Sequence, residues 1–105
     1  MLDFIKQLLG LGPSVDFGQL VQEGAVIIDV RTPSEYNSGH IKGAENIPLN
    51  EIGKRINYLK QKNKTVITCC RSGNRSAMAA SQLKQAGITS YNGGAWHALQ
   101  QKISK

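Results

Sequence analysis

Residues 65–80, TVITCCRSGNRSAMAA, are the most informative segment of the chain. The β-branched run at residues 65–68 is typical of a buried strand, and the alanine-rich run at residues 77–80 favours a helix. Between them lies the heptapeptide Cys70-Arg71-Ser72-Gly73-Asn74-Arg75-Ser76. A cysteine at such a strand-to-helix turn has its sulfur close to backbone N–H groups and to the positive end of the helix. The segment therefore predicts a nucleophilic cysteine in an anion-binding loop.

Several residues of this loop support Cys70 as the nucleophile. Gly73 allows the backbone to bend around a bound anion, so that successive N–H groups point inward. Ser76 is expected to cap the following helix, whose dipole adds about half a positive charge. Such surroundings lower the pKa of a cysteine from about 8.5 to roughly 3.5–7.5. We therefore expect a thiolate at neutral pH without a partner histidine.

Two adjacent cysteines make the identity of the nucleophile ambiguous. Counted from Cys70 the loop reads Cys-x4-Arg, whereas counted from Cys69 it reads Cys-x5-Arg-Ser, the signature of cysteine phosphatases. The two Cα atoms are only about 3.8 Å apart, which excludes an ordinary structural disulfide. Cys69 ends the strand and suits a small buried hydrophobe. The polar and basic residues around Cys70 favour Cys70 as the functional cysteine.

The rest of the chain alternates between strands and helices. Strands are expected at residues 25–30, 44–48, 65–69 and 88–91, with helices after Asp16, Thr32 and Asn50 as capping residues, over residues 76–86, and over residues 96–102 after a Gly93-Gly94 turn. This alternation predicts an α/β domain with a small, mostly parallel sheet flanked by helices on both faces. Ligands of such sheets bind beyond the carboxyl ends of the strands. Asp29 and Cys70 both lie there, so the two candidate sites are expected to converge.

The length of 105 residues, of which 40% are hydrophobic, predicts one domain. We expect residues 1–12 to be a short amphipathic extension and residues 13–105 to form the domain. Asp3 and Lys6 interrupt the apolar start and no cleavage site follows, which is unlike a signal peptide. No apolar run in the sequence is long enough to cross a bilayer. A cytoplasmic protein without a membrane partner is therefore expected.

The positive net charge of the chain indicates which classes of partner it can bind. Thirteen Lys and Arg against seven Asp and Glu give a net charge of +6, which suits an anionic small substrate. Aromatic residues are few and are not interleaved with the basic stretch at residues 54–64, so nucleic-acid binding is not expected. No His, Cys, Asp or Glu cluster has metal-ligand spacing. Neither a metal nor an organic cofactor is expected.

The chain resembles the single-domain rhodaneses, which are thiosulfate or persulfide sulfurtransferases. The resemblance runs from about Val15 to Lys102 and rests on IDVRTPSEY at 28–36, GHIKGAENIPL at 39–49, CRSGNRS at 70–76 and GGAW at 93–96. In rhodanese-like proteins the cysteine that begins the six-residue loop carries the sulfur, and inactive members lack it; that position is Cys70 here. The resemblance implies the rhodanese-like fold. It also implies transfer of sulfur from thiosulfate or a persulfide donor, through a Cys70 persulfide, to a thiol or cyanide acceptor.

The substrate-binding residues implied by this reading are those of the loop: Arg71, Ser72, Gly73, Asn74, Arg75 and Ser76. Loop N–H groups are expected to stabilise the persulfide and an anionic donor. Arg71 is expected to contact the donor oxyanion because its side chain is free to face solvent. Arg75 either binds the oxyanion as well or braces the loop by bonding its carbonyl groups.

Residues outside the loop are expected to support it. Asp29 and Arg31 either shape the mouth of the site or form an ion pair. Glu35 is expected to complete a capping box with Thr32, His40 to have a structural role, and Trp96 to lie in the core.

Two other functions remain open at this point. The first is a phosphatase or arsenate reductase that uses Cys69, although Thr68 stands where phosphatases usually carry a histidine. The second is a non-catalytic module that delivers sulfur on Cys70 to a protein partner. A redox role for Cys69 toward a Cys70 persulfide is disfavoured, because a disulfide between adjacent cysteines is strained.

Overall fold

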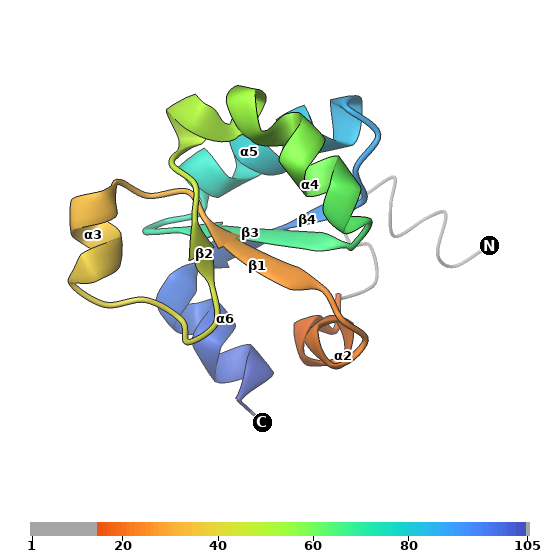
Figure 1. Cartoon of the computed structure of the whole chain (residues 1–105). Helices are drawn as coiled ribbons and strands as arrows, with labels where there is room; N and C mark the ends of the chain where they lie inside the picture. The colour runs from red at the N-terminus through yellow and green to blue at the C-terminus, as the bar shows by residue number, and fades with distance from the viewer. Residues whose placement is uncertain (1–14, 105) are drawn as a thin grey trace, which may run out of the picture.

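The computed structural model describes residues 15–104, which form one sheet with helices on both faces (Figure 1). The sheet has four parallel strands in the order β2-β1-β3-β4. These strands are β1 (Val26–Asp29), β2 (Glu45–Asn46), β3 (Val66–Cys70) and β4 (Ser90–Ala95). The predicted α/β architecture is confirmed. The expected amphipathic extension, residues 1–12, lies outside the described residues.

Helices from different parts of the chain cover the two faces of the sheet. One face is covered by α2 (Phe17–Gln22) and α6 (Trp96–Ile103). The other is covered by the 3-10 helix η1 (Leu49–Arg55), α4 (Ile56–Lys62) and α5 (Asn74–Gln85), as Figure 1 shows. The short helix α3 (Pro33–Asn37) follows the end of β1. Because all strands are parallel, their carboxyl ends lie at the same end of the sheet, and the loop after β3 lies there too.

Strand β3 is buried along its whole length because helices pack on both of its faces. Side chains alternate between the faces of a strand. Val66 and Cys70 therefore join the core beneath α4 and α5, whereas Ile67 and Cys69 join the core beneath α2 and α6. The two adjacent cysteines thus point to opposite sides of the sheet.

The predictions made at Asn50 and at Gly93-Gly94 are wrong. Asn50 does not begin a helix, because η1 starts at Leu49 and has no side-chain cap. The Leu49 N–H donates a hydrogen bond to the carbonyl of Val30 at 3.0 Å. Gly93 and Gly94 do not form a turn, because β4 continues through both to Ala95. A Cβ on Gly93 would lie 2.7 Å from the carbonyl oxygen of Thr68. Glycine at position 93 therefore permits β4 to approach β3 closely.

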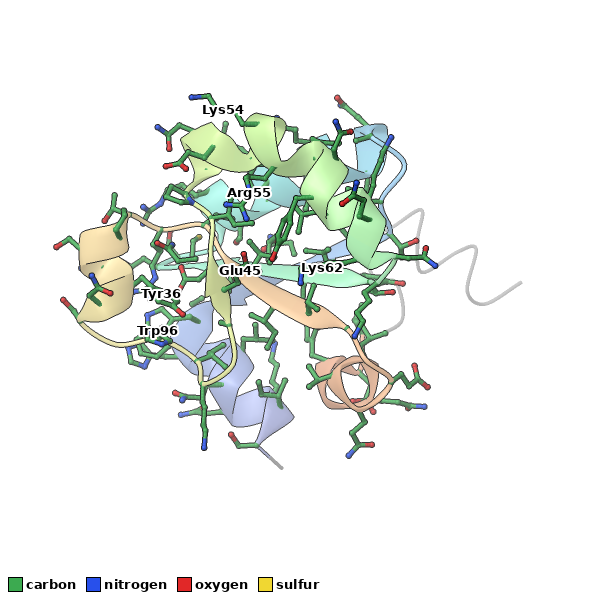
Figure 2. All side chains as sticks on the ribbon, in the orientation of Figure 1. Tyr36, Glu45, Lys54, Arg55, Lys62 and Trp96 are labelled. Atoms are coloured by element: carbon green, nitrogen blue, oxygen red, sulfur yellow. The ribbon has the colours of Figure 1, made fainter. Side chains whose placement is uncertain are left out.

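The carboxylate of Glu45 connects the edge strand β2 to the helices η1 and α4 (Figure 2). This carboxylate accepts hydrogen bonds from Arg55 Nη2 at 3.3 Å and from Tyr58 Oη at 2.9 Å. The Arg55 guanidinium also lies over the Tyr58 ring, 4.3 Å from its centroid. These contacts join β2 to η1 and α4.

Candidate active site

The loop between β3 and α5 surrounds the sulfur of Cys70. The Gly73 N–H donates to Cys70 Sγ at 3.0 Å and the Ser76 N–H donates to it at 3.4 Å. In the thiol form the sulfur donates to Ser76 Oγ at 3.3 Å. Gly73 has a φ of +104°, a conformation that glycine adopts readily and other residues avoid. The geometry is that of an anion-binding turn closed around one sulfur atom.

The prediction that Ser76 caps the following helix is wrong. Helix α5 begins at Asn74, with Gly73 in the capping position, so Ser76 lies inside the first turn. The N–H groups of a first helical turn need an acceptor from outside the helix, and the Ser76 N–H finds one in the Cys70 sulfur. The sulfur thus takes the place that a capping side chain would occupy.

Opposing effects act on the acidity of Cys70, which is wholly buried. Burial raises the pKa of its thiol, whereas hydrogen bonds from the Ser76 hydroxyl and from the N–H groups of Ser76, Gly73 and Ser72 lower it. Together these bonds outweigh the burial, so the pKa of Cys70 lies below that of an ordinary cysteine. The loop therefore favours the nucleophilic thiolate form.

Cys69 has the opposite character. It is also wholly buried, but it packs with Phe17, Ile41 and Leu99 on the other face of the sheet. Burial, and secondly the charge of Asp29, raise the pKa of Cys69 to about 12. Cys69 is therefore a core thiol that remains protonated at neutral pH. The phosphatase-like pattern Cys-x5-Arg-Ser begins at this residue, whose side chain points away from the loop.

The two arginines of the loop have different surroundings. Arg71 is exposed. Of the two roles expected of Arg75, bracing of the loop carbonyls is not seen, because its guanidinium forms a bidentate ion pair with Glu35 on α3, at 2.8 and 3.0 Å. Hydrogen bonds from Arg75, and next from the backbone of Thr32, lower the pKa of Glu35 to about 2. Glu35 also completes the predicted capping box with Thr32.

Asp29 and Arg31 form a buried ion pair, in agreement with one of the two expected roles, and Asp29 is in register with Cys69 and not with Cys70. Arg31 Nε and Nη2 donate to the Asp29 carboxylate at 2.9 and 2.6 Å, and Nη2 also donates to the Gly39 carbonyl at 2.7 Å. The guanidinium lies 4.9 Å from the centroid of the Trp96 ring, which packs at the margin of the core beneath α6. Figure 2 shows Trp96 at the start of that helix. The pair joins the end of β1 to the segment after α3.

His40 is held by its own neighbours. Its Nδ1 lies 2.7 Å from the carbonyl oxygen of Tyr36, and its ring stacks on the Tyr36 ring with centroids 3.7 Å apart. These contacts favour the structural role that was expected of this histidine. Among residues 15–104, no group of three or more His, Cys, Asp or Glu side chains is placed to hold a metal ion. No helix in the same range has the length and apolar character needed to span a membrane.

Asn92 on β4 is a site residue that the sequence alone did not indicate. Its Oδ1 accepts a hydrogen bond from Ser76 Oγ at 2.6 Å and another from the Gly94 N–H at 2.9 Å. Its Nδ2 donates to the Gly73 carbonyl at 3.3 Å. The signal that the sequence offered was the position of Asn92 directly before Gly93-Gly94. In the structure Asn92 pairs in register with Thr68 on β3.

Comparison with known proteins gives the same picture of the fold. The family description "Rhodanese-like domain" matches residues 15–99. One similar relative is the thiosulfate sulfurtransferase PspE of Escherichia coli, which is 43% identical over 59% of this chain and 61% of its own length. Another is the putative sulfur carrier protein YrkF of Bacillus subtilis, which is 45% identical over 63% of this chain and 35% of its own length. A solved structure, a rhodanese with anions from E. coli, superposes with a TM-score of 0.64 at 37% identity, covering 70% of this chain and 89% of that one.

These curated relatives are longer than the matched region, which spans about a third to three fifths of their length. The family match nevertheless covers nearly all of the described residues, including the loop around Cys70. The chain therefore belongs to the rhodanese-like domain family.

Proposed function

We propose that the protein is a sulfurtransferase that carries sulfane sulfur on Cys70, within a domain spanning residues 13–105. The single observation that carries this proposal is the set of donors around the Cys70 sulfur, with the Gly73 N–H at 3.0 Å and the Ser76 N–H at 3.4 Å. N–H groups fixed in this way stabilise a thiolate and, after reaction, an anionic persulfide. Relatives named as a thiosulfate sulfurtransferase and a putative sulfur carrier support the same chemistry.

The proposed reaction consists of two displacements at sulfur. In the first, the Cys70 thiolate attacks the outer sulfur of thiosulfate. A new S–S bond forms, the old S–S bond breaks, and its electron pair leaves with sulfite; the product is a Cys70 persulfide anion. In the second, cyanide or a thiolate acceptor attacks the outer sulfur of that persulfide and releases the Cys70 thiolate. Electrons balance in each step without an external oxidant or a cofactor.

Donor capture is assigned to the exposed part of the loop. Arg71 and Ser72 are exposed to solvent, whereas the Cys70 sulfur beside them is buried, so the exposed loop is the expected route to the sulfur. An anionic donor therefore meets the Arg71 guanidinium before it meets Cys70, and guanidinium groups suit bidentate binding of oxyanions. Arg75 is assigned to joining the first turn of α5 to α3, since its guanidinium is paired with Glu35.

A sulfur-delivery role is the second candidate, favoured by the 45% identity to the putative sulfur carrier YrkF. Both roles use the same persulfide and differ in the acceptor, which is a small nucleophile in one case and a partner protein in the other. A phosphatase reaction at Cys69 is disfavoured by the burial of that side chain on the opposite face of the sheet.

The test compares Cys70→Ser and Cys69→Ser with the wild type. After incubation with thiosulfate, mass spectrometry is expected to find a gain of about 32 Da on Cys70 in the wild type and in Cys69→Ser, and none in Cys70→Ser. Thiocyanate production with cyanide is expected to follow the same order. Persulfide loading with negligible thiocyanate production identifies the delivery role. Loading on Cys69, or phosphate-ester hydrolysis lost only in Cys69→Ser, contradicts the proposal.

A further inference from the structure

Asn92 lies beside the candidate nucleophile and connects three parts of the site. It comes from β4, the strand next to β3, and reaches the first turn of α5, the loop glycine and the Gly94 backbone. Its contact with Ser76 Oγ, at 2.6 Å, is shorter than the 3.3 Å between that oxygen and the Cys70 sulfur. The Ser76 hydroxyl therefore links the Asn92 amide to the Cys70 sulfur.

The orientation of the Asn92 amide is fixed by two neighbours. The Gly94 N–H can only donate, so the atom that faces it at 2.9 Å must be the acceptor Oδ1. The Gly73 carbonyl can only accept, so the atom that faces it at 3.3 Å must be the donor Nδ2. The reversed amide would oppose like groups at both contacts. Ser76 therefore faces Oδ1, to which its hydroxyl can only donate.

The Ser76 hydroxyl has one hydrogen and two possible acceptors. In the thiol form the hydrogen bonds run in one direction, from Cys70 Sγ to Ser76 Oγ and from there to Asn92 Oδ1. When Cys70 loses its proton, the sulfur becomes an acceptor and competes with Asn92 for the Ser76 hydrogen. A hydroxyl cannot satisfy both acceptors with one hydrogen.

We propose that Asn92 is a positioning residue of this site, which competes with the Cys70 sulfur for the hydroxyl hydrogen of Ser76. The inference rests on the proposed role of Cys70 as the sulfur carrier. A thiolate that is stabilised too strongly is a weaker nucleophile, and the best attacking thiol titrates near the ambient pH. By competing for the Ser76 hydrogen, Asn92 weakens the hydrogen bond from Ser76 to the thiolate, which limits the stabilisation of the thiolate and keeps its sulfur reactive.

A double-mutant cycle tests this competition. The thiolate of Cys70 is titrated by its ultraviolet absorbance in the wild type, Asn92→Ala, Ser76→Ala and the double variant, with Cys70→Ser as the blank. In Asn92→Ala the Ser76 hydrogen is free to turn to the sulfur. The thiolate fraction below the titration midpoint is expected to rise about tenfold, and at most roughly a hundredfold, the effect of one hydrogen bond to a charged group. In the Ser76→Ala background, Asn92→Ala is expected to leave the titration unchanged.

Two further variants control for folding and for the retained acceptor. Asn92→Leu keeps the volume and removes the acceptor, so it carries the same expectation as Asn92→Ala if the alanine variant fails to fold. Asn92→Asp keeps an acceptor for Ser76 and adds a negative charge, and both changes are expected to prevent a rise in the thiolate fraction. Apart from the carboxylate that Asn92→Asp adds, the charged groups near the site are the same in every variant: Arg71, the Arg75–Glu35 pair and the Asp29–Arg31 pair.

A merely structural role would give a different pattern. If Asn92 only fastens the Gly73 carbonyl, its removal loosens the loop and lowers the thiolate fraction in both backgrounds. That result, or an equal shift with and without the Ser76 hydroxyl, overturns the proposal. Sulfur loading on Cys70 of the wild-type protein is measured in parallel, so that failure of the competition is distinguished from failure of the proposed function.

Discussion

Cys69 and Cys70 are adjacent and equally buried, yet their acidities move in opposite directions. Cys70 accepts hydrogen bonds from two backbone N–H groups, whereas Cys69 packs among apolar side chains of the other core. The difference arises from strand geometry, because neighbouring side chains point to opposite faces. One residue of sequence therefore separates a thiol whose pKa is lowered by the loop from a core thiol whose pKa is raised by burial.

Gly73→Ala tests the loop conformation at the scale of one residue. The φ of +104° at Gly73 is strained for any residue with a Cβ, and we expect the variant to lose about 1–2 kcal/mol of unfolding free energy. The displaced N–H is also expected to weaken its bond to Cys70 and to raise the pKa of the thiol. Denaturant unfolding and thiolate titration measure the two effects.

Gly18→Ala is the matched control for the added methyl group. The nearest atoms to a Cβ at either position are 3.5 Å away, but Gly18 lies in α2 without a positive φ. Alanine there is expected to be neutral or to stabilise by about 0.5–1 kcal/mol. Equal behaviour of the two variants would show that the conformation of Gly73 does not matter to the site.

At the level of helices and strands, hydrogen bonds and an ion pair join the first turn of α5 to β3, β4 and α3. Thr68 Oγ1 on β3 donates to the Ser76 carbonyl at 2.7 Å, and Asn92 on β4 accepts from the Ser76 hydroxyl. The Arg75–Glu35 ion pair joins the same turn to α3. These contacts hold the start of the helix where its N–H groups meet the Cys70 sulfur.

Glu35→Gln tests the contact between α3 and α5 through its pH dependence. The pKa of Glu35 in the folded protein, about 2, lies below its ordinary value of 4.5. The charged form therefore stabilises the fold above pH 4.5, and this contribution is lost as the pH falls from 4.5 toward 2. Because both side chains are about one third exposed, the contribution is expected to be no more than about 1 kcal/mol.

The measurement is the unfolding free energy of the wild type and of Glu35→Gln as a function of pH. The stability difference between them is expected to be largest near neutral pH and to shrink in the acid range. Glu51→Gln, which removes another exposed acidic residue on η1, serves as the charge-matched control. A difference that stays constant down to pH 2 would mean that Glu35 makes no such ion pair in solution.

At the scale of the whole molecule, the net charge of +6 bears on donor capture. Raising the ionic strength from about 0.01 M to about 0.15 M shortens the Debye length from about 30 Å to about 8 Å. Persulfide formation from the thiosulfate dianion is expected to slow as salt is added, whereas alkylation of Cys70 by neutral iodoacetamide stays nearly constant. Stopped-flow rates for both reagents measure this contrast.

The variants Arg71→Gln and Lys84→Gln locate the charge responsible. Both side chains are exposed, but Arg71 lies in the loop and Lys84 in the last turn of α5. Arg71→Gln is expected to lower the thiosulfate rate severalfold and to weaken its salt dependence, while Lys84→Gln has little effect. Equal effects of the two changes would indicate that only the total charge matters.

Much of the fold followed from local patterns, since β-branched runs predicted the strands and the Thr32–Glu35 capping box predicted α3. The candidate cysteine followed from the turn around it. Asn92 could not be predicted, because its role depends on which strand lies beside β3. The capping role assigned to Ser76 was wrong because local propensity does not reveal that a sulfur from the preceding strand accepts its N–H.

The most direct test is the pH dependence of iodoacetamide labelling in the folded wild-type protein, with peptide mass spectrometry to locate the label. The loop geometry predicts that the label appears on Cys70 with a midpoint below that of an ordinary cysteine, about 8.5, and that Cys69 stays unlabelled. A midpoint at or above that of an ordinary cysteine, or labelling of Cys69 first, would contradict the assignment of Cys70 as the stabilised thiolate.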